Sequence, residues 1–183
     1  ALGLSRFAGR RFVVSLVNTG MGMPPVVVGL VVTIMLWRSG PLGLLGILYT
    51  PWAMIVAQVI IAAPIVTGVS MAAMSQLDPR LRQQLLGLGA SRVQMVWVLF
   101  QEARLPLLTA VMAGFGGVIS EVGAVMMVGG NIKGETRVLT TATVLATSRG
   151  EFGLAIALGI LALLLAYIVN LVLTSVQQRG RPQ

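Results

Sequence analysis

The residues that most often carry chemistry are scarce in this chain. Its 183 residues include no histidine and no cysteine, which excludes disulfides, thiol catalysis and the common zinc sites. The five acidic residues are scattered, with no pair at a spacing suited to acid–base catalysis. No glycine-rich loop followed by lysine and serine or threonine occurs, so that nucleotide-binding motif is missing. We expect no catalytic residue, no metal site and no cofactor bound by this chain.

One acid, Glu121, has unusual neighbours. It is the only charged residue in the apolar stretch 105–127. An acid in the middle of a membrane segment costs about 2.5 to 3.5 kcal/mol on insertion scales. Three interpretations are open: the carboxyl is protonated, it pairs with a base such as Arg137 or Arg104, or it lies close to an interface. We favour a pair with a structural or gating role.

A polar segment interrupts the apolar sequence at residues 78–104. Within it, Gly87 and Gly89 break the helical pattern or admit another backbone, and Ser91 is a good N-cap for a following helix. The segment therefore predicts a helix, a glycine turn and a second helix at the membrane surface. Such a hairpin, with small residues at its corner, fits a groove of another protein. Lone interfacial helices are the alternative, and they would not need a Gly-Ala-Ser corner.

The rest of the sequence indicates the class of protein. Charged side chains are absent from residues 12–37, 39–77 and 152–178, and about 20 apolar residues suffice to cross a bilayer as a helix. We expect an all-α integral membrane protein, a polytopic helical bundle. The net charge of +8 comes from arginines at the edges of the apolar runs, as the positive-inside bias predicts. We therefore expect the positive charges of this chain to contact the lipid bilayer, and we expect no nucleic acid as a partner.

Two candidate spans contain proline. The first, residues 11–37, includes Pro24 and Pro25, each of which removes a backbone donor and clashes with the preceding turn. This helix should be kinked or split there. The second, residues 51–75, includes Pro64, where we expect another kink.

The second half of the chain has two more long apolar segments, residues 105–127 and 152 to about 175. Residues 138–148 are apolar but too short to cross, so they should form a re-entrant or tilted half-helix. Residues 1–12 read like the exit from an earlier membrane segment. We therefore expect at least one more span upstream of this chain.

The corner of the polar segment resembles the coupling motif of importer-class ABC-transporter permeases. That motif reads Glu-Ala-Ala, three residues, Gly-Ala, and Leu-Pro further on. Gly89 and Ala90 match its Gly-Ala, whereas Gln83 stands where the family has Glu. Leu105-Pro106 lies about four residues later than usual, which is roughly one helical turn.

Three further stretches are similar to a narrower group within that family. SEVGAVMMVGGN (120–131) and ETRVLTTATVLATSRGEF (135–152) closely resemble tungstate-type permeases, which belong with molybdate and sulfate permeases. NTGMGMPPVVVGL (18–30) resembles the same larger group. The resemblance covers nearly the whole chain. It implies one transmembrane permease domain, residues 1–183, of the type I ABC importer kind, with a cytoplasmic coupling region at 78–104.

The resemblance also implies partners. Members of the family are homodimers in the inner membrane of the cell, with a pathway along the dimer axis. Two cytoplasmic ATPase subunits, which bind ATP and magnesium, dock on the coupling helices, and an extracytoplasmic binding protein delivers the oxyanion. The expected coupling corner consists of Gln83, Leu88, Gly89, Ala90, Ser91 and Arg92.

An oxyanion pathway needs hydrogen-bond donors, which backbone amides, hydroxyls and arginines supply. The candidates, together with Glu121, are Gly129, Gly130, Asn131, Thr136, Arg137 and Thr140, followed by Thr141 and Thr143. The alternative is that Gly-Gly-Asn forms an ordinary turn and that the threonines bond to carbonyls of their own helix.

Two other functions remain open for the chain as a whole. An ion-coupled secondary transporter or channel would work without an ATPase, but it needs ion-coupling groups within the spans, and only Glu121 qualifies. A membrane protein that serves for assembly or anchoring, without transport, is the other function. That function would not explain the Leu-Gly-Ala-Ser corner.

Overall fold

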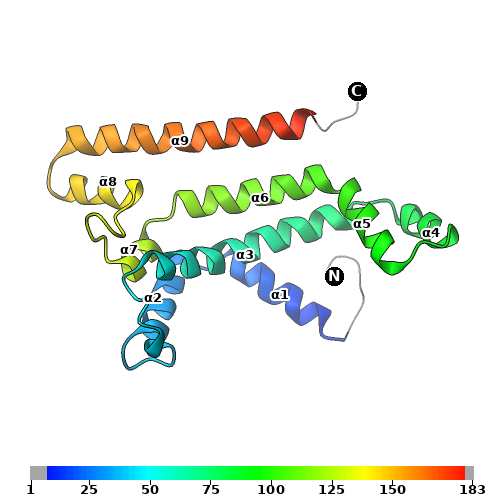
Figure 1. Cartoon of the computed structure of the whole chain (residues 1–183), viewed down its shortest axis with the longest axis horizontal. Helices are drawn as coiled ribbons and strands as arrows, with labels where there is room; N and C mark the ends of the chain where they lie inside the picture. The colour runs from blue at the N-terminus through cyan, green and yellow to red at the C-terminus, as the bar shows by residue number, and fades with distance from the viewer. Residues whose placement is uncertain (1–7, 180–183) are drawn as a thin grey trace.

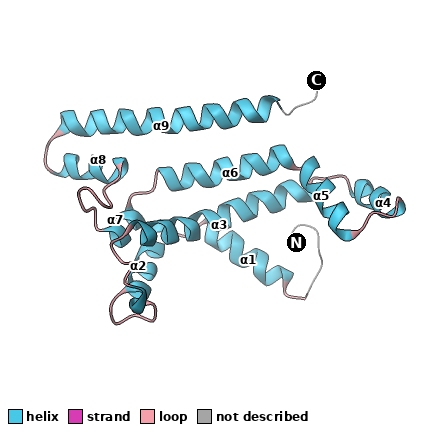
Figure 2. Cartoon of the chain, viewed as in Figure 1, coloured by secondary structure: helices cyan, strands magenta, loops and turns pink. Residues whose placement is uncertain are grey.

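The computed structural model describes residues 8–179, which are almost entirely helical and contain no strand (Figure 2). The all-α prediction is therefore confirmed for this part of the chain. The upstream span that we expect lies outside the described residues. In chain order the elements are α1 (Arg10–Met21), α2 (Pro25–Leu36), the 3-10 turn η1 (Gly43–Leu45), α3 (Pro51–Ser75), α4 (Pro79–Gly87), α5 (Arg92–Glu102), α6 (Arg104–Ile119), α7 (Gly123–Gly129), α8 (Leu139–Ser148) and α9 (Phe152–Arg179).

Two of the described helices are long and apolar enough to cross a membrane. Helix α3 has 25 residues and α9 has 28, which at 1.5 Å per residue gives lengths of about 38 and 42 Å, longer than a hydrocarbon core of about 30 Å. Two bent pairs, α1 with α2 and α5 with α6, also pass the same test of length and composition if each pair counts as one span. The helix predicted over residues 51–75 is confirmed, and the last apolar helix extends beyond residue 175.

The break predicted at Pro24-Pro25 is confirmed, and it is sharp. Helices α1 and α2 meet at 105°. Pro24 has extended backbone angles as the residue preceding α2, and Pro25 occupies the first turn of the new helix, where a missing amide hydrogen costs nothing. Helix α3, by contrast, runs through Pro64 without interruption. A kink at Pro64 stays a prediction.

The apolar stretch 105–127 is divided between two helices. Helix α6 ends at Ile119 and α7 begins at Gly123. At the break, the hydroxyl of Ser120 donates to the Gly116 carbonyl at 2.9 Å, and a carboxylate oxygen of Glu121 accepts from the Ala124 amide at 2.9 Å. The Glu121 side chain thus takes the Ala124 amide, which in a continuous helix would donate to the Ser120 carbonyl, and the Glu121 amide donates to the Val118 carbonyl at 3.1 Å, so the chain turns here.

The main core lies where α2, α3 and α7 meet. Its buried residues are Val28, Val32, Leu36, Ala53, Met54, Ala57, Ile61, Ala124, Val125 and Val128. The closest approach joins Gly29 of α2 to Ala124 of α7, where an added Cβ on Gly29 would lie 2.6 Å from the Ala124 Cα. Small residues at this contact allow two backbones to pack directly.

Outside this core the molecule is open. Figure 1 shows α3 and α6 side by side, with α9 running alongside and α8 folded back against the beginning of α9. The accessible surface is 12025 Å², whereas a compact soluble monomer of this mass exposes roughly 8,500 Å². In α9, none of the most apolar 18-residue window is buried. Lipid or other chains must cover such a surface.

Candidate functional site

Two ends of the bundle carry the residues that the sequence singled out. Figure 1 shows α4 and α5 at one end and α7, α8 and their connecting loop at the other. We refer to residues 78–103 as the helical hairpin and to residues 129–140 as the distal loop. The spans lie between them.

The turn of the helical hairpin is specified by hydrogen bonds. The amide of Ala90 donates to the Leu85 carbonyl at 3.0 Å, and the amide of Gly89 donates to the Leu86 carbonyl at 3.1 Å. These two bonds and the φ of 77° at Gly89 form a Schellman motif, which ends α4 in the left-handed conformation that glycine adopts without strain. Among the described residues, no atom apart from the adjoining residues lies within 4 Å of an added Gly89 Cβ, so the positive φ, rather than a close packing contact, explains this glycine.

The second helix of the hairpin begins directly after that turn. The Ser91 hydroxyl accepts from the Gln94 amide at 3.3 Å, and the Gln94 side chain accepts from the Ser91 amide at 2.8 Å. This reciprocal pair is a capping box. The prediction that Ser91 caps a helix is confirmed. Asp78 similarly begins α4 by accepting from the Arg80 amide at 2.8 Å.

The hairpin packs on the end of the membrane-length helix α3 and on the beginning of α6. Its buried residues Met95, Leu99 and Ala103 cluster with Met74 of α3, and partly buried leucines of α4 and α6 pack around them. A displacement of the hairpin therefore acts directly on the end of α3 and on the beginning of α6. Pro106 lies in the first turn of α6, where proline does not interrupt a helix.

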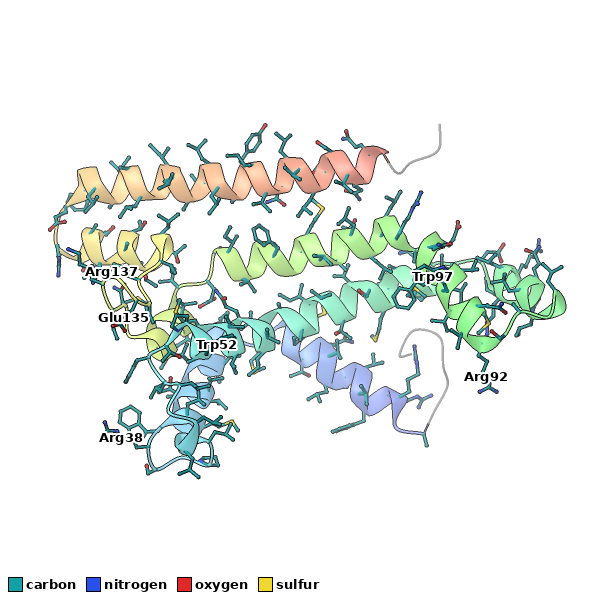
Figure 3. All side chains as sticks on the ribbon, viewed as in Figure 1. Arg38, Trp52, Arg92, Trp97, Glu135 and Arg137 are labelled. Carbon is teal, nitrogen blue, oxygen red and sulfur yellow. The ribbon has the colours of Figure 1, made fainter. Side chains whose placement is uncertain are left out.

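Of the six predicted coupling residues, five form the corner at 88–92 and Gln83 lies within α4, and none of the six is buried. Leu88 is 84% exposed, and Ala90, the least exposed of the six, is half-buried. Figure 3 shows Arg92 pointing away from the bundle. The corner thus presents an apolar tip, small residues and a positive charge to whatever lies outside this chain.

At the other end, Thr136 holds the distal loop together. Its side chain is 1% exposed. The hydroxyl donates to the Gly129 carbonyl and accepts from the Ile132 amide at 2.9 Å. Gly130 and Asn131 have positive φ values of 71° and 51°. The segment is therefore a tight, internally bonded loop.

Arg137 and Asn131 form the polar surface of this loop. The guanidinium donates from Nε to the Asn131 side-chain oxygen at 3.2 Å and from a terminal nitrogen to the Asn131 carbonyl at 3.1 Å. Thr140 reaches across to the Glu121 carbonyl at 3.4 Å. The structure therefore brings the predicted pathway residues of α8 next to the break between α6 and α7.

A cavity of about 630 Å³ lies beside these residues. Its polar lining comes from Gln58, Glu121, Arg137 and Thr140, and apolar residues of α6, α8 and α9 complete the wall. Sequence reasoning missed Gln58. The signal was available, because Gln58 is the only amide or charged side chain in α3, residues 51–75.

Two other threonines bond to carbonyls of their own segment, as the alternative interpretation of these hydroxyls predicted. Thr141 and Thr143 donate to the carbonyls of Val138 and Leu139 in their own segment, at 3.1 and 2.8 Å. Thr141 is fully buried. Their hydroxyls are used for local structure, and a role in binding an oxyanion stays a prediction for Gly129, Gly130, Asn131, Thr136, Arg137 and Thr140.

The end of α1, just before the Pro24-Pro25 break, packs on the middle of α3. An added Cβ on Gly20, near the end of α1, would lie 2.8 Å from the Pro64 ring of α3, and one on Gly68 would lie 2.4 Å from the Met21 sulfur. The α1–α2 bend therefore packs against the middle of α3.

Charge is distributed unequally between the two ends. The hairpin end carries Arg10, Arg11, Arg80, Arg82, Arg92 and Arg104 with the acids Asp78 and Glu102, whereas the distal end carries Arg38, Lys133, Arg137 and Arg149 with the other three acids. Figure 3 shows Arg137 and Glu135 together in the distal region, far from Arg92. The hairpin end is the more positive of the two.

Known proteins are similar to this chain over most of its length. The tungstate uptake system permease protein TupB of Peptoclostridium acidaminophilum is 40% identical over 176 residues, covering 96% of this chain and 77% of that protein. A probable anion ABC transporter permease protein of Haloferax volcanii is 42% identical, covering 93% and 75%. The molybdenum transport system permease protein ModB of Escherichia coli (strain K12) is 28% identical, covering 87% and 77%.

Membrane-length helices and an exposed hairpin at one end define a polytopic helical membrane protein, and the similarity to known permeases narrows this class to ABC-transporter permeases. More specifically, the chain belongs to the family described as the binding-protein-dependent transport system inner membrane component, which matches residues 1–182. The resemblance that the sequence indicated is confirmed.

Proposed function

We propose that this chain is the membrane subunit of an ATP-driven importer for an oxyanion, with tungstate as the preferred substrate. The proposal is supported by the similarity to tungstate uptake permeases over 96% of the chain. In this proposal the chain is a multi-pass protein of the inner membrane of the cell, and the hairpin faces the cytoplasm. The excess of arginines at the hairpin end favours this orientation.

The corner of the helical hairpin is the docking element for a separate ATPase. The observation that carries this assignment is the exposed turn at Gly89, which a Schellman motif and a capping box hold in one conformation. A rigid corner can transmit a displacement, whereas a flexible loop would absorb it. Because the hairpin packs on the ends of α3 and α6, movement of the docked ATPase tilts both helices together.

Transport then follows from a two-state equilibrium. Two ATPase subunits, which bind ATP and magnesium, close around nucleotide and favour one orientation of the spans, and their opening favours the other. A second copy of this chain completes the pathway, and an extracytoplasmic binding protein delivers the anion. The apolar surface of α9 and the open arrangement in Figure 1 are consistent with an assembly larger than one chain.

The cavity at the distal end is where the oxyanion first meets this chain on its way across the membrane. Arg137, Thr140 and Gln58 line it and supply donors to an oxyanion without surrounding it completely. A weak site suits a transporter, because the anion has to leave. Glu121 lines the same cavity and limits how tightly an anion is held.

An ion-coupled secondary transporter or channel is the second candidate. Its support is Glu121, the one acid within the apolar segments, but its carboxylate caps α7. The two functions differ in whether an ATPase is needed.

Reconstitution distinguishes them. The permease is placed in vesicles with its ATPase and its external binding protein, and ATP hydrolysis is measured with tungstate, molybdate and sulfate in turn. We expect hydrolysis to rise most with tungstate and to require the permease. Uptake of tungstate by the permease alone, driven by an ion gradient, would support the second candidate instead.

A further inference from the structure

Helix α5 carries a second apolar face that nothing within residues 8–179 covers. Val93 is 80% exposed, Trp97 65%, Phe100 46% and Val96 38%. At 100° per residue these four side chains fall within an arc of about 100° on the helix surface. The buried residues Met95 and Leu99 occupy a different arc, so the exposed face is additional to the one that packs on the bundle. We call Val93, Val96, Trp97 and Phe100 the outer face of α5.

The depth of α5 along the bundle is fixed by its packing. Met95 and Leu99 cluster with Met74 at the end of α3 and with Leu107 at the beginning of α6. Helix α3 has the length and composition of a span, so its last turn lies where the hydrocarbon core meets the headgroups. The outer face of α5 is held at that same level.

The direction of α5 suits this position. It meets α6 at 68°, so it runs across the end of the bundle and not along the spans. Figure 3 places Trp97 beside the end of α3, whereas Arg92 points away from the bundle. A transverse helix at this level presents its side along the membrane surface.

The chemistry of the helix favours lipid over water on this side. Exposed Gln94 and Gln101 form a polar stripe next to the outer face, as in helices that lie in the interface plane. Tryptophan is enriched at the headgroup level because its ring is apolar and its nitrogen is polar.

We propose that the outer face of α5 inserts into the boundary between headgroups and acyl chains on the hairpin side of the membrane, and that Trp97 anchors it there. The occupant of this face is the lipid bilayer. The proposal rests on the membrane location of the chain and not on its coupling to an ATPase. The two parts of the hairpin then have different roles. The corner at Gly89 stays outside the membrane, and the outer face of α5 inserts into the membrane surface.

Tryptophan fluorescence tests the proposal in the assembled transporter. Trp37 and Trp52 are replaced by phenylalanine, which leaves Trp97 as the only tryptophan among residues 1–183. The complex is reconstituted in vesicles of phosphatidylglycerol and phosphatidylcholine whose acyl chains are brominated near the carbonyl. Subtracting the emission of the same complex with Trp97→Phe removes the signal of tryptophans in partner subunits. We expect the Trp97 signal to be shifted to the blue, to lose intensity with brominated lipid and to resist aqueous iodide.

A matched control moves the probe around the same helix. Glu102→Trp, combined with Trp97→Phe, places the indole on an exposed position of α5 roughly 140° away. We expect this probe to respond to iodide and not to brominated lipid. The ATPase activity of each variant checks that the complex is intact.

Three results would overturn the proposal. If brominated lipid leaves the Trp97 signal unchanged while iodide quenches it, the face is in water. If adding the ATPase to the permease shields Trp97 from both quenchers, a protein covers the face. If positions 97 and 102 respond equally to brominated lipid, no particular face of α5 is inserted.

Discussion

Ser91 and Gln94 cap each other at the start of α5. Each backbone amide donates to the other residue's side-chain oxygen, at 2.8 and 3.3 Å. Because the Schellman turn at Gly89 ends only one residue earlier, the chain passes from one helix to the next without a flexible residue between them. The geometry of the corner thus depends on local bonds more than on packing.

Replacing Ser91 by alanine should weaken the corner. The change removes the acceptor for the Gln94 amide, and loss of an N-cap costs about 1 kcal/mol. Ser91→Asp should retain most of the stability, since aspartate caps helices as well as serine does. The measurement is the thermal stability of the purified permease together with the amount of ATPase that copurifies with it. Equal values for Ser91→Ala and the unchanged protein would contradict a structural role for the cap.

The contact between Gly29 and Ala124 should tolerate no added side chain. A Cβ at position 29 would come within 2.6 Å of the Ala124 backbone, so Gly29→Val must push α2 and α7 apart. Overpacking of this kind typically costs about 1–3 kcal/mol. Gly159→Val in α9 is the matched control, because no atom lies within 4 Å of that position. Thermal unfolding in detergent should separate the two variants; a Gly29→Val protein as stable as Gly159→Val would count against this packing.

Thr136 should be more important for the shape of the distal loop than for contact with the substrate. Thr136→Val keeps the volume but leaves the Gly129 carbonyl and the Ile132 amide without their partner, at a cost of about 1–3 kcal/mol. Thr136→Ser keeps the hydroxyl and should restore stability. Thr147→Val, at an exposed site, should have little effect. If Thr136→Val is fully stable but transports poorly, the hydroxyl instead belongs to the pathway.

The Glu121 side chain accepts a hydrogen bond from the Ala124 amide and also lines the cavity. One substitution separates the effect of the bond from the effect of the charge. The amide oxygen of Glu121→Gln can still accept from the Ala124 amide, so folding should be retained. We expect uptake to change, because a carboxylate facing the cavity near Arg137 affects how an anion passes. Uptake in vesicles at several tungstate concentrations checks this. Normal transport by Glu121→Gln would remove any need for the charge.

Much of the fold could be predicted because strong local signals determine it. Pro24 and Pro25 predict the bend before α2, Gly89 and Ser91 predict the corner, and the uncharged run before Asp78 predicts α3. Each of these is a property of a few adjacent residues, so no tertiary information was needed.

The break at Ser120 and Glu121 was missed because hydropathy does not report it. The segment is apolar on both sides, and the turn is visible only in the structure, where α6 ends at Ile119, α7 begins at Gly123 and Glu121 accepts from the Ala124 amide. The site was harder still. The cavity joins Gln58 to Thr140, residues from helices far apart in the chain, and no pattern within one segment brings them together.

The central claim is that the corner at Gly89 transmits force between a separate ATPase and the spans. Gly89→Val tests it most directly, because a β-branched residue is strained at a φ of 77° although no neighbouring atom obstructs it. Gly87→Val is the matched control, since position 87 is helical and equally free of neighbours. The measurement is tungstate-stimulated ATP hydrolysis by the reconstituted transporter, with ATPase copurification measured in parallel. We predict that Gly89→Val loses the stimulation while Gly87→Val keeps it; full attachment and full stimulation in Gly89→Val would contradict the account.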